Sequence, residues 1–322
     1  MKELEKNLYE FYLPLPKSPL RDIRCYFIRG EKRHLLIDTA FNCDDCEQAL
    51  YTRLDEIGAK IEDTDIFITH KHIDHSGLIG RLKRESNTVY ASAADKVLID
   101  AYQTDYHHNR ILAYLNHTGI PEHQRLLPED HVALIMKSDR LVDITTLKEG
   151  DKISVGGFNF EVLEVPGHSP GHLALWEPEK KYLFSGDHIL GDISPTISPW
   201  DLENDYLEMY INSLRKVREM NVRKIFPAHR VVPSDVNARI DEIITHHDKR
   251  LAAIVHQLEI AGRPMNAYEI ALRLKWDMRT PLLENLTYLW FASMETLAHL
   301  QNLRFKGRVR CARQGDVLHF SV

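Results

Sequence analysis

Cysteine is scarce in this sequence, with four residues among 322. Four cysteines are too few for a disulfide framework in a chain of this length, so we expect reduced thiols. Cys43 and Cys46 form one C-x-x-C pair, and no second pair or thioredoxin-like context accompanies it. A zinc or redox site built on cysteine is therefore not expected.

The sequence also lacks long apolar runs. No segment approaches the roughly 20 apolar residues that a membrane-spanning helix needs. The first six residues, Met1 to Lys6, mix charged and apolar side chains and do not have the layout of a signal peptide. We therefore expect a cytoplasmic protein that makes no membrane contact.

Positive charge is not in excess, because the net charge is −6. From position 241 onward there are 11 basic and 9 acidic residues, against 30 and 38 in the first 240. Such an acidic body does not fit a protein that coats nucleic acid over its whole surface. Five basic residues near the end are compatible with weak RNA binding: Arg304, Lys306, Arg308, Arg310 and Arg313.

The first 240 residues repeat one pattern, a short β-like run that ends in a polar loop. This alternation with helical segments such as 43–57 and 76–84 is typical of an α/β domain. The expected strands are 24–29, 34–37, 65–69, 88–91, 158–165, 182–185 and 224–227.

One long stretch, residues 92–138, interrupts this pattern and predicts a helical insertion. Tyr106 and His107 belong to a set of aromatic and histidine side chains that can share helical faces there. Two interpretations stay open. The insertion is either a lid that supplies substrate contacts, or a packed element whose aromatic residues form core and dimer contacts.

The second change of pattern begins near residue 241. Helices are expected over 241–261, 266–276 and 282–303, followed by strands 308–312 and 317–322 around a Gly315-Asp316 turn. Three helices and a two-stranded wing make a winged-helix pattern, which assigns residues 241–322 to a second domain. The third helix has no Lys or Arg between Leu282 and Leu300, so sequence-specific DNA binding is not expected. Its apolar excess predicts that the catalytic domain or a second subunit of a homo-oligomer covers it.

The most informative segment is H-x-H-x-D-H, formed by His70, His72, Asp74 and His75 directly after the apolar run 66–69. A loop at a strand end is where an α/β scaffold places reactive groups. Imidazole and carboxylate together suit zinc, iron or manganese. The segment therefore predicts a metal site.

Three later strands end in one further candidate ligand each. Residues 160–165 lead to His168, residues 182–185 to Asp187, and residues 224–226 to His229. Each side chain taken alone could be structural. Together they supply the missing ligands at one edge of a sheet.

Here the sequence resembles the metallo-β-lactamase superfamily, whose signature is T-H-x-H-x-D-H followed by G-H, G-D and a final H. The resemblance covers about residues 20–235 and implies a four-layer αββα sandwich, with the helical insertion and the winged helix as additions. It implies that His70, His72 and His168 hold one metal, that Asp74, His75 and His229 hold a second, and that Asp187 bridges them. Asp38, in the segment Leu35 to Ala40, and Thr69 would support these ligands from behind.

The resemblance also implies two divalent ions per chain, most simply zinc, with iron or manganese as alternatives. Two such ions can supply hydroxide at neutral pH and stabilise an oxyanion. Asp74 is the expected proton acceptor. Substrate contacts are expected from Tyr106, His107, His188 and Thr196, the last in a loop that is either substrate-facing or simply rigid.

Three functions follow from these observations. The favoured one is hydrolysis of a small ester, thioester or lactone. The second is cleavage of phosphodiester bonds in single-stranded RNA, guided by the basic tail. The third is a metal-retaining sensor or effector that uses the winged helix to bind a partner. Within the superfamily the chain resembles the branch that attaches a C-terminal winged helix to this fold, a branch that includes endoribonucleases and hydrolases of unknown substrate. It differs in this from hydroxyacylglutathione hydrolases, whose C-terminal region is helical.

Overall fold

The computed structural model describes residues 1–278 and 280–322 and contains two mixed β-sheets that stack face to face. The larger sheet has the order β1-β2-β3-β4-β5-β6-β7, and the smaller one β12-β11-β10-β9-β8. The first sheet is formed by β1 (Lys2–Glu5), β2 (Leu8–Pro14), β3 (Asp22–Ile28), β4 (His34–Ile37), β5 (Thr64–Phe67), β6 (Val89–Ser92) and β7 (Ile144–Leu147). The second sheet is formed by β8 (Lys152–Val155), β9 (Phe158–Glu164), β10 (Leu173–Glu177), β11 (Tyr182–Gly186) and β12 (Lys224–Pro227).

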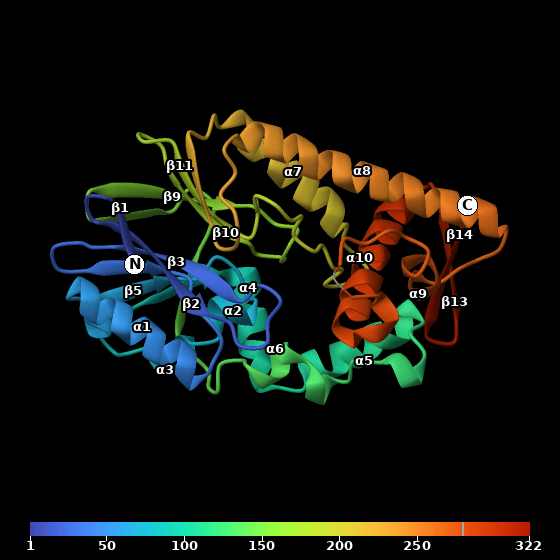
Figure 1. Ribbon diagram of the computed structural model, residues 1–322, viewed down its shortest axis with the longest axis horizontal. Helices are drawn as coiled ribbons and strands as arrows, with labels where there is room; N and C mark the ends of the chain where they lie inside the picture. The colour runs from blue at the N-terminus through green and yellow to red at the C-terminus, as the bar shows by residue number, and fades with distance from the viewer. Residues whose placement is uncertain (279) are drawn as a thin grey trace.

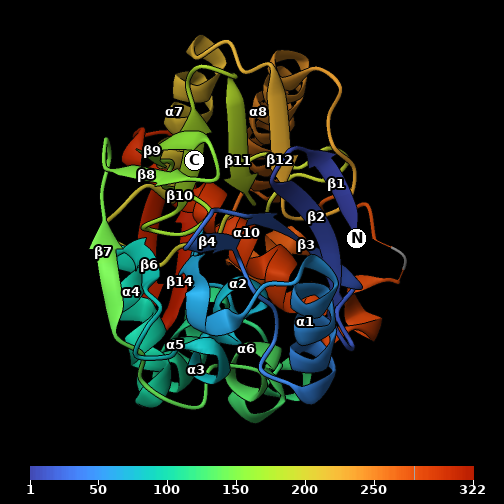
Figure 2. The same cartoon turned by 90° about the vertical axis from the view of Figure 1, so that its left-hand side faces the viewer.

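Helices cover the outer face of each sheet (Figures 1 and 2). The helices of the chain are α1 (Asp44–Ile57), α2 (Ile73–Ser76), α3 (Ile79–Leu82), α4 (Ala93–Asp100), α5 (Tyr106–Thr118), α6 (Val132–Ile135), α7 (Tyr206–Glu219), α8 (Val236–Ala261), α9 (Ala267–Ala271) and α10 (Leu286–Phe305). Short 3₁₀ turns lie at 61–63, 101–103, 122–124, 128–130 and 282–284. The hairpin of β13 (Arg310–Gln314) and β14 (Val317–Ser321) follows α10.

Three apolar clusters hold these layers together. One lies between the sheets and joins residues such as Tyr26 and Phe67 to Phe184 and Phe226. A second packs the outer face of the first sheet against α1 and α3. The third packs the outer face of the second sheet against α7 and α8 and continues into the C-terminal helices. Burial of each apolar sheet face explains the layered arrangement.

The expected strands are present, and their ends differ from the expected ones by at most two residues. Sequence reasoning missed the N-terminal strands β1 and β2, the strands β7, β8 and β10, and the helix α7. Strand β10 is buried on both faces. Its residues therefore do not alternate between apolar and polar, and this alternation is the pattern that marks a half-exposed strand in a sequence.

Two predicted helices have different bounds in the structure. The helix expected over 76–84 is shorter in the structure, where α3 spans Ile79–Leu82, and Gly77 and Leu78 separate it from α2. The helix expected from 241 begins at Val236 instead, because the Asp235 side chain accepts a hydrogen bond from the Ala238 amide and caps it.

The C-terminal elements follow the predicted order, and α9 and α10 are shorter than expected. α9 ends at Ala271 rather than 276, and α10 begins at Leu286 after the 3₁₀ turn, with Asn285 as its N-cap. The first wing strand begins at Arg310 rather than 308. Figure 1 shows α8 running from the second sheet to the C-terminal hairpin.

The insertion is helical, as expected, and it packs against the C-terminal region. α5 contacts both α10 and β14, and Ile111 and Leu115 share an apolar cluster with Leu289 and Met294. α10 also contacts α7, which belongs to the second sheet's helical layer. The third helix of the C-terminal pattern is therefore covered by other parts of the same chain. Among the described residues, no helix combines the length and the apolar character needed to cross a membrane.

Candidate metal centre

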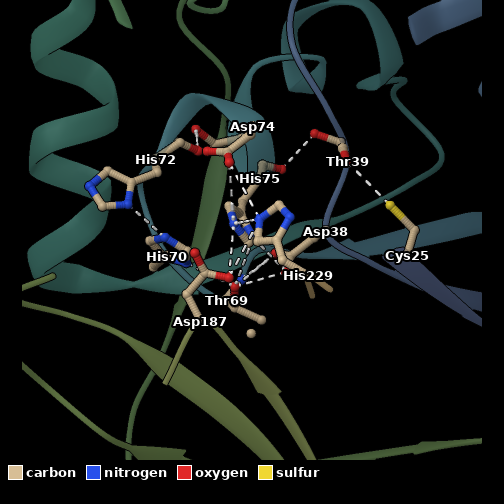
Figure 3. Close-up of polar contacts among 12 residues, drawn as sticks. Cys25, Asp38, Thr39, Thr69, His70, His72, Asp74, His75, Asp187 and His229 are labelled. Carbon is tan, nitrogen blue, oxygen red and sulfur yellow. Dashed lines mark hydrogen bonds and ion pairs between the residues drawn. The ribbon is translucent and has the colours of Figure 1, made fainter. Parts of the chain in front are cut away.

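Four loops at strand ends bring the predicted ligands to one place. His70 to His75 follow β5 and continue into α2, His168 follows β9, Asp187 follows β11, and His229 follows β12. The two sheets thus present these loops along a shared edge. Figure 3 shows the side chains of the motif, Asp187 and His229 turned toward a common centre.

Donor atoms gather there in three overlapping groups, each with its atoms within 4.8 Å of one another. The groups are His70, His72 and His168, then His70, His75 and Asp187, then Asp74, His75 and His229. His70 Nε2 and His72 Nδ1 are 2.8 Å apart. His229 Nε2 lies 3.4 Å from Asp74 Oδ2 and 3.3 Å from His75 Nε2. All seven predicted ligands therefore belong to one cluster.

Asp187 faces both sides of this cluster. Its Oδ2 lies 3.7 Å from His168 Nε2. Its Oδ1 lies 3.6 Å from His75 Nε2 and 3.5 Å from His229 Nε2. One oxygen of the carboxylate is thus available to each group of imidazoles.

Hydrogen bonds made by Nδ1, on the side of the ring that faces away from the cluster, fix the orientation of three imidazoles. His75 donates from Nδ1 to Asp38 Oδ2 at 2.8 Å, His168 to the Thr196 carbonyl at 2.9 Å, and His229 to the Asp22 carbonyl at 3.0 Å. Each ring consequently directs Nε2 into the cluster. Such bonds fix the tautomer and raise the basicity of a ligand.

Asp38 is held in an unusual backbone conformation, with a φ of 61°. Its carboxylate accepts hydrogen bonds from the Thr69 amide, at 2.8 Å, and from the Thr69 hydroxyl. Aspartate tolerates the left-handed region better than most residues. Asp38 and Thr69 thus lie behind the ligands, where the resemblance had placed them.

The residues of this cluster fit a divalent metal. His168 Nε2 and Asp187 Oδ1 are buried and have no hydrogen-bond partner among the described residues. Unpartnered buried polar atoms are rare and indicate a missing ion or ligand. Burial, and then the neighbouring His75 and His72, hold the pKa of His70 well below its usual range, which keeps the imidazole in its neutral, metal-binding form.

Two buried residues that sequence reasoning missed support the same loops. The Asp187 amide donates to His172 Nε2 at 3.2 Å, and the His172 ring stacks on His70 with centroids 4.7 Å apart. Asp95, at the start of α4, accepts from the Lys71 amide, the Gly171 amide and the Ser169 hydroxyl. The H-x-x-x-H spacing of 168 and 172 was a usable signal for His172, whereas nothing local marked Asp95.

The structure also places a basic and aromatic group beside the ligands. Lys71 Nζ lies 3.7 Å from the ring centroid of Trp200, and the Arg110 guanidinium lies 4.3 Å from it. The Trp200 indole donates to the His168 carbonyl at 3.2 Å, and its ring lies 5.7 Å from that of His72. Sequence reasoning did not identify this group, whose members come from three separate segments.

The four predicted substrate contacts lie in different environments. Tyr106 is exposed, but His107 is 4% exposed and its Nε2 donates to the Leu98 carbonyl at 2.7 Å. His188 is 0% exposed and packs against Tyr210. The carbonyl oxygen of Thr196 accepts a hydrogen bond from His168 and so orients that ring. Both rings are buried; the His107 ring is engaged with a backbone carbonyl, whereas substrate contact by His188 stays a prediction.

The metallo-beta-lactamase superfamily model matches residues 19–229. The chain therefore belongs to this superfamily and is a metallohydrolase of its fold. A metallo-beta-lactamase family protein from Thermus thermophilus shares 26% identity and a TM-score of 0.83, over 99% of both chains. The probable metallo-hydrolase YqjP of Bacillus subtilis is 23% identical over 94% of this chain and 93% of its own length.

Other relatives carry the names of more specific enzymes. The hydroxyacylglutathione hydrolase GloC of Haemophilus influenzae is 29% identical over 58% of this chain and 73% of its own length. The atrochrysone carboxyl ACP thioesterase dmxR1 of Cryptosporiopsis is 22% identical over 76% of this chain and 60% of its own length. Relatives of this chain thus include enzymes named for the hydrolysis of thioesters.

Proposed function

We propose that this protein is a dinuclear metallohydrolase that cleaves small carboxylic thioesters, with esters and lactones as related substrates. The observation that carries the proposal is the position of Asp187, whose two oxygens face His168 on one side and His75 and His229 on the other. A carboxylate so placed suits a bridge between two ions. The names of the thioester-cleaving relatives support the choice of bond.

In this proposal His70, His72 and His168 hold one ion, Asp74, His75 and His229 hold the other, and Asp187 contacts both. Two divalent ions held there, zinc in the simplest case, would polarise the substrate carbonyl and would lower the pKa of water enough to supply hydroxide at neutral pH. Water adds across the carbonyl, the carbon–sulfur bond breaks, and the products are a carboxylic acid and a thiol.

In this reaction the chain's own residues orient the ligand imidazoles and accept the proton of the attacking water. Asp38, Thr196 and the Asp22 carbonyl keep three imidazoles in a fixed tautomer. Asp74 is partly exposed and lies at the edge of the cluster, where Oδ2 can hold a proton taken from water. Trp200 lies beside the cluster, where its indole donates to the His168 carbonyl.

The C-terminal region supports a winged-helix domain over residues 241–322, with its first helix starting at 236. Met265 lies between the first and second helices and forms an antiparallel bridge with Phe320 of β14, with both backbone hydrogen bonds present. This bridge joins the segment between the first two helices to the hairpin, and it supports our proposal that the C-terminal region is a winged helix.

The structure gives little support to the alternative that the protein cleaves RNA. Within the basic tail, Arg304 donates to the Leu202 carbonyl, Lys306 pairs with Glu208 and Arg313 pairs with Asp316, so three of its five cations are already engaged. The catalytic part keeps its acidic excess, which repels a long polyanion.

An activity panel on metal-loaded protein tests the proposal. The substrates are S-butyryl-N-acetylcysteamine, p-nitrophenyl butyrate, a lactone, bis-p-nitrophenyl phosphate and labelled single-stranded RNA. We expect thioester hydrolysis that Asp187→Asn abolishes. Turnover of the phosphodiesters alone, or no turnover of any carboxylic substrate, would overturn the proposed function.

A further inference from the structure

A buried lysine lies between two metal-ligand candidates without an acidic partner. Lys71 is 3% exposed, and its Nζ donates to the Tyr102 hydroxyl at 3.4 Å and lies over the rings of Tyr102 and Trp200. Among residues 1–278 and 280–322, no carboxylate oxygen comes within 4.0 Å of this ammonium group. An amino group with one long hydrogen bond and two ring faces as neighbours is poorly satisfied, and burial together with the Arg110 guanidinium lowers the pKa of Lys71 well below its usual range.

A second basic side chain reaches the same place from the insertion. Arg110 of α5 stacks its guanidinium on Trp200 and on Tyr114, and it donates to the carbonyls of Pro199 and Trp200. It too has no carboxylate within 4.0 Å in the described part of the chain. Lys71 and Arg110 therefore lie against the same indole ring although like charges repel each other.

The nearby acidic groups are already engaged elsewhere. The Asp95 carboxylate accepts from two backbone amides and the Ser169 hydroxyl. Asp74 belongs to the ligand cluster, 3.4 Å from His229 Nε2. Packing alone does not explain the arrangement, because buried basic residues in folded proteins are normally paired.

Lys71 and Arg110 also have a defined position relative to the ligand cluster. Trp200 is tied to the His168 carbonyl, and its ring lies 5.7 Å from that of His72. Lys71 and Arg110 both contact Trp200, and Trp200 contacts His72, so one side chain separates the basic pair from the ligand cluster. An arginine from the insertion and a lysine from the motif loop can together bind a carboxylate.

We propose that Lys71 and Arg110, held against Trp200, form a subsite for a carboxylate of the substrate, so that the preferred substrates are thioesters with an acidic group. This inference rests on the proposed function for the bond that is cleaved. The carboxylate can belong to the acyl part or to the thiol part, and the test distinguishes these sources.

Three thioesters serve as probes on the metal-loaded protein. S-succinyl-N-acetylcysteamine carries a carboxylate on its acyl part, S-butyrylglutathione carries carboxylates on its thiol part, and S-butyryl-N-acetylcysteamine carries none. We expect wild-type kcat/KM to be at least about tenfold higher for one acidic probe than for the neutral one, the effect of a charge-assisted hydrogen bond. No preference for either acidic probe would overturn the subsite.

Lys71→Met and Arg110→Met remove one charge each from separate elements. Each should reduce kcat/KM for the preferred acidic probe about tenfold more than for the neutral probe, mainly through KM. Lys96→Met is the matched control, because Lys96 pairs with Asp100 at the surface of α4 and should change no preference. Elemental analysis and circular dichroism verify metal content and folding. Equal losses on all three probes would indicate a structural role and overturn the proposal.

A binding measurement that needs no turnover distinguishes failure of the carboxylate subsite from failure of the proposed function. If no thioester is hydrolysed, the proposed function fails, but calorimetric titration of succinate into the wild type and both variants still tests the subsite. Binding weaker by about tenfold in both variants supports it. Equal affinity in wild type and variants overturns it.

Discussion

Asp38 and His75 form a buried pair, with Asp38 Oδ2 2.8 Å from His75 Nδ1 and neither residue more than 1% exposed. The two residues are 37 positions apart and come from different strand ends. Because the same carboxylate also binds the Thr69 amide, it fixes the motif loop and the ligand ring together. The orientation of the metal ligands is therefore built into the core of the first sheet.

Removal of this carboxylate should weaken metal binding. We expect Asp38→Ala to lower metal affinity or activity by roughly 10 to 100-fold, the usual effect of losing the partner of a ligand imidazole. Competition with a chromophoric chelator measures the affinity. Asp44→Ala, which changes an exposed aspartate of α1, is the control. Full metal affinity in Asp38→Ala would contradict the orienting role.

Asp187 should matter more than any other single ligand. Its two oxygens face separate imidazole groups, so Asp187→Ala leaves two cations without the charge that lies between them. We expect loss of both ions and of all turnover, measured by elemental analysis and by thioester hydrolysis. The wild type should contain two ions per chain when purified without chelator. An active variant that retains two ions would show that the bridge lies elsewhere.

Asp95 should contribute to stability, because its buried carboxylate joins the motif loop to the loop of His168. Asp95→Ala leaves the Lys71 and Gly171 amides without their acceptor. We expect the free energy of unfolding to fall by about 2 to 5 kcal/mol, by analogy with other lost buried hydrogen bonds. Denaturant titration measures it, and Ser169→Ala, which removes one donor, should cost about 1 kcal/mol. Similar losses for both variants would contradict the central position of Asp95.

Glu295 on α10 should make stability depend on acid pH. Burial alone would raise its pKa, but the ion-pair contacts with His246 and Arg250, each at 3.9 Å, outweigh it and lower the pKa to about 2. A carboxyl with a lower pKa in the folded state stabilises above its unfolded value of 4.5, and this contribution is lost as pH falls toward 2.

The matched variant isolates this effect. At neutral pH we expect Glu295→Gln to be less stable than the wild type by about 3 kcal/mol. The difference in unfolding free energy should shrink as pH falls from about 6 to about 3. Denaturant titrations of both proteins at each pH measure it. A difference that stays constant with pH would show that the charge of Glu295 makes no net contribution.

Duplex DNA should not bind with sequence preference. The helix that would enter the major groove, α10, has most of its side chains buried and contacts α5, α7, α8 and α9. Base reading needs exposed Arg, Lys, Asn or Gln on that helix. Titration of labelled duplexes and of single-stranded RNA at near-physiological salt tests this expectation. Tight duplex binding that varies with sequence would refute it, whereas weak RNA binding that fades with salt is the electrostatic effect of the wing.

The sequence alone determined the ligand set and its placement at strand ends. His70 to His75 are contiguous, and His168, Asp187 and His229 each follow an apolar run, so local pattern was sufficient to select them. The same holds for the helical insertion and for the order of the C-terminal elements. Their exact ends were not predictable, because caps such as Asp235 depend on contacts of individual atoms.

Tertiary structure alone decided what surrounds those ligands. Arg110, Lys71 and Trp200 meet from segments 39 to 129 positions apart, and Asp95 joins loops 24 and 76 residues away. It also enclosed His107 and His188, which looked available in sequence. Metal ligands follow a local pattern because one loop must supply several of them. The residues that orient a ligand or contact a substrate need only be close in space, and packing of distant elements determines that closeness.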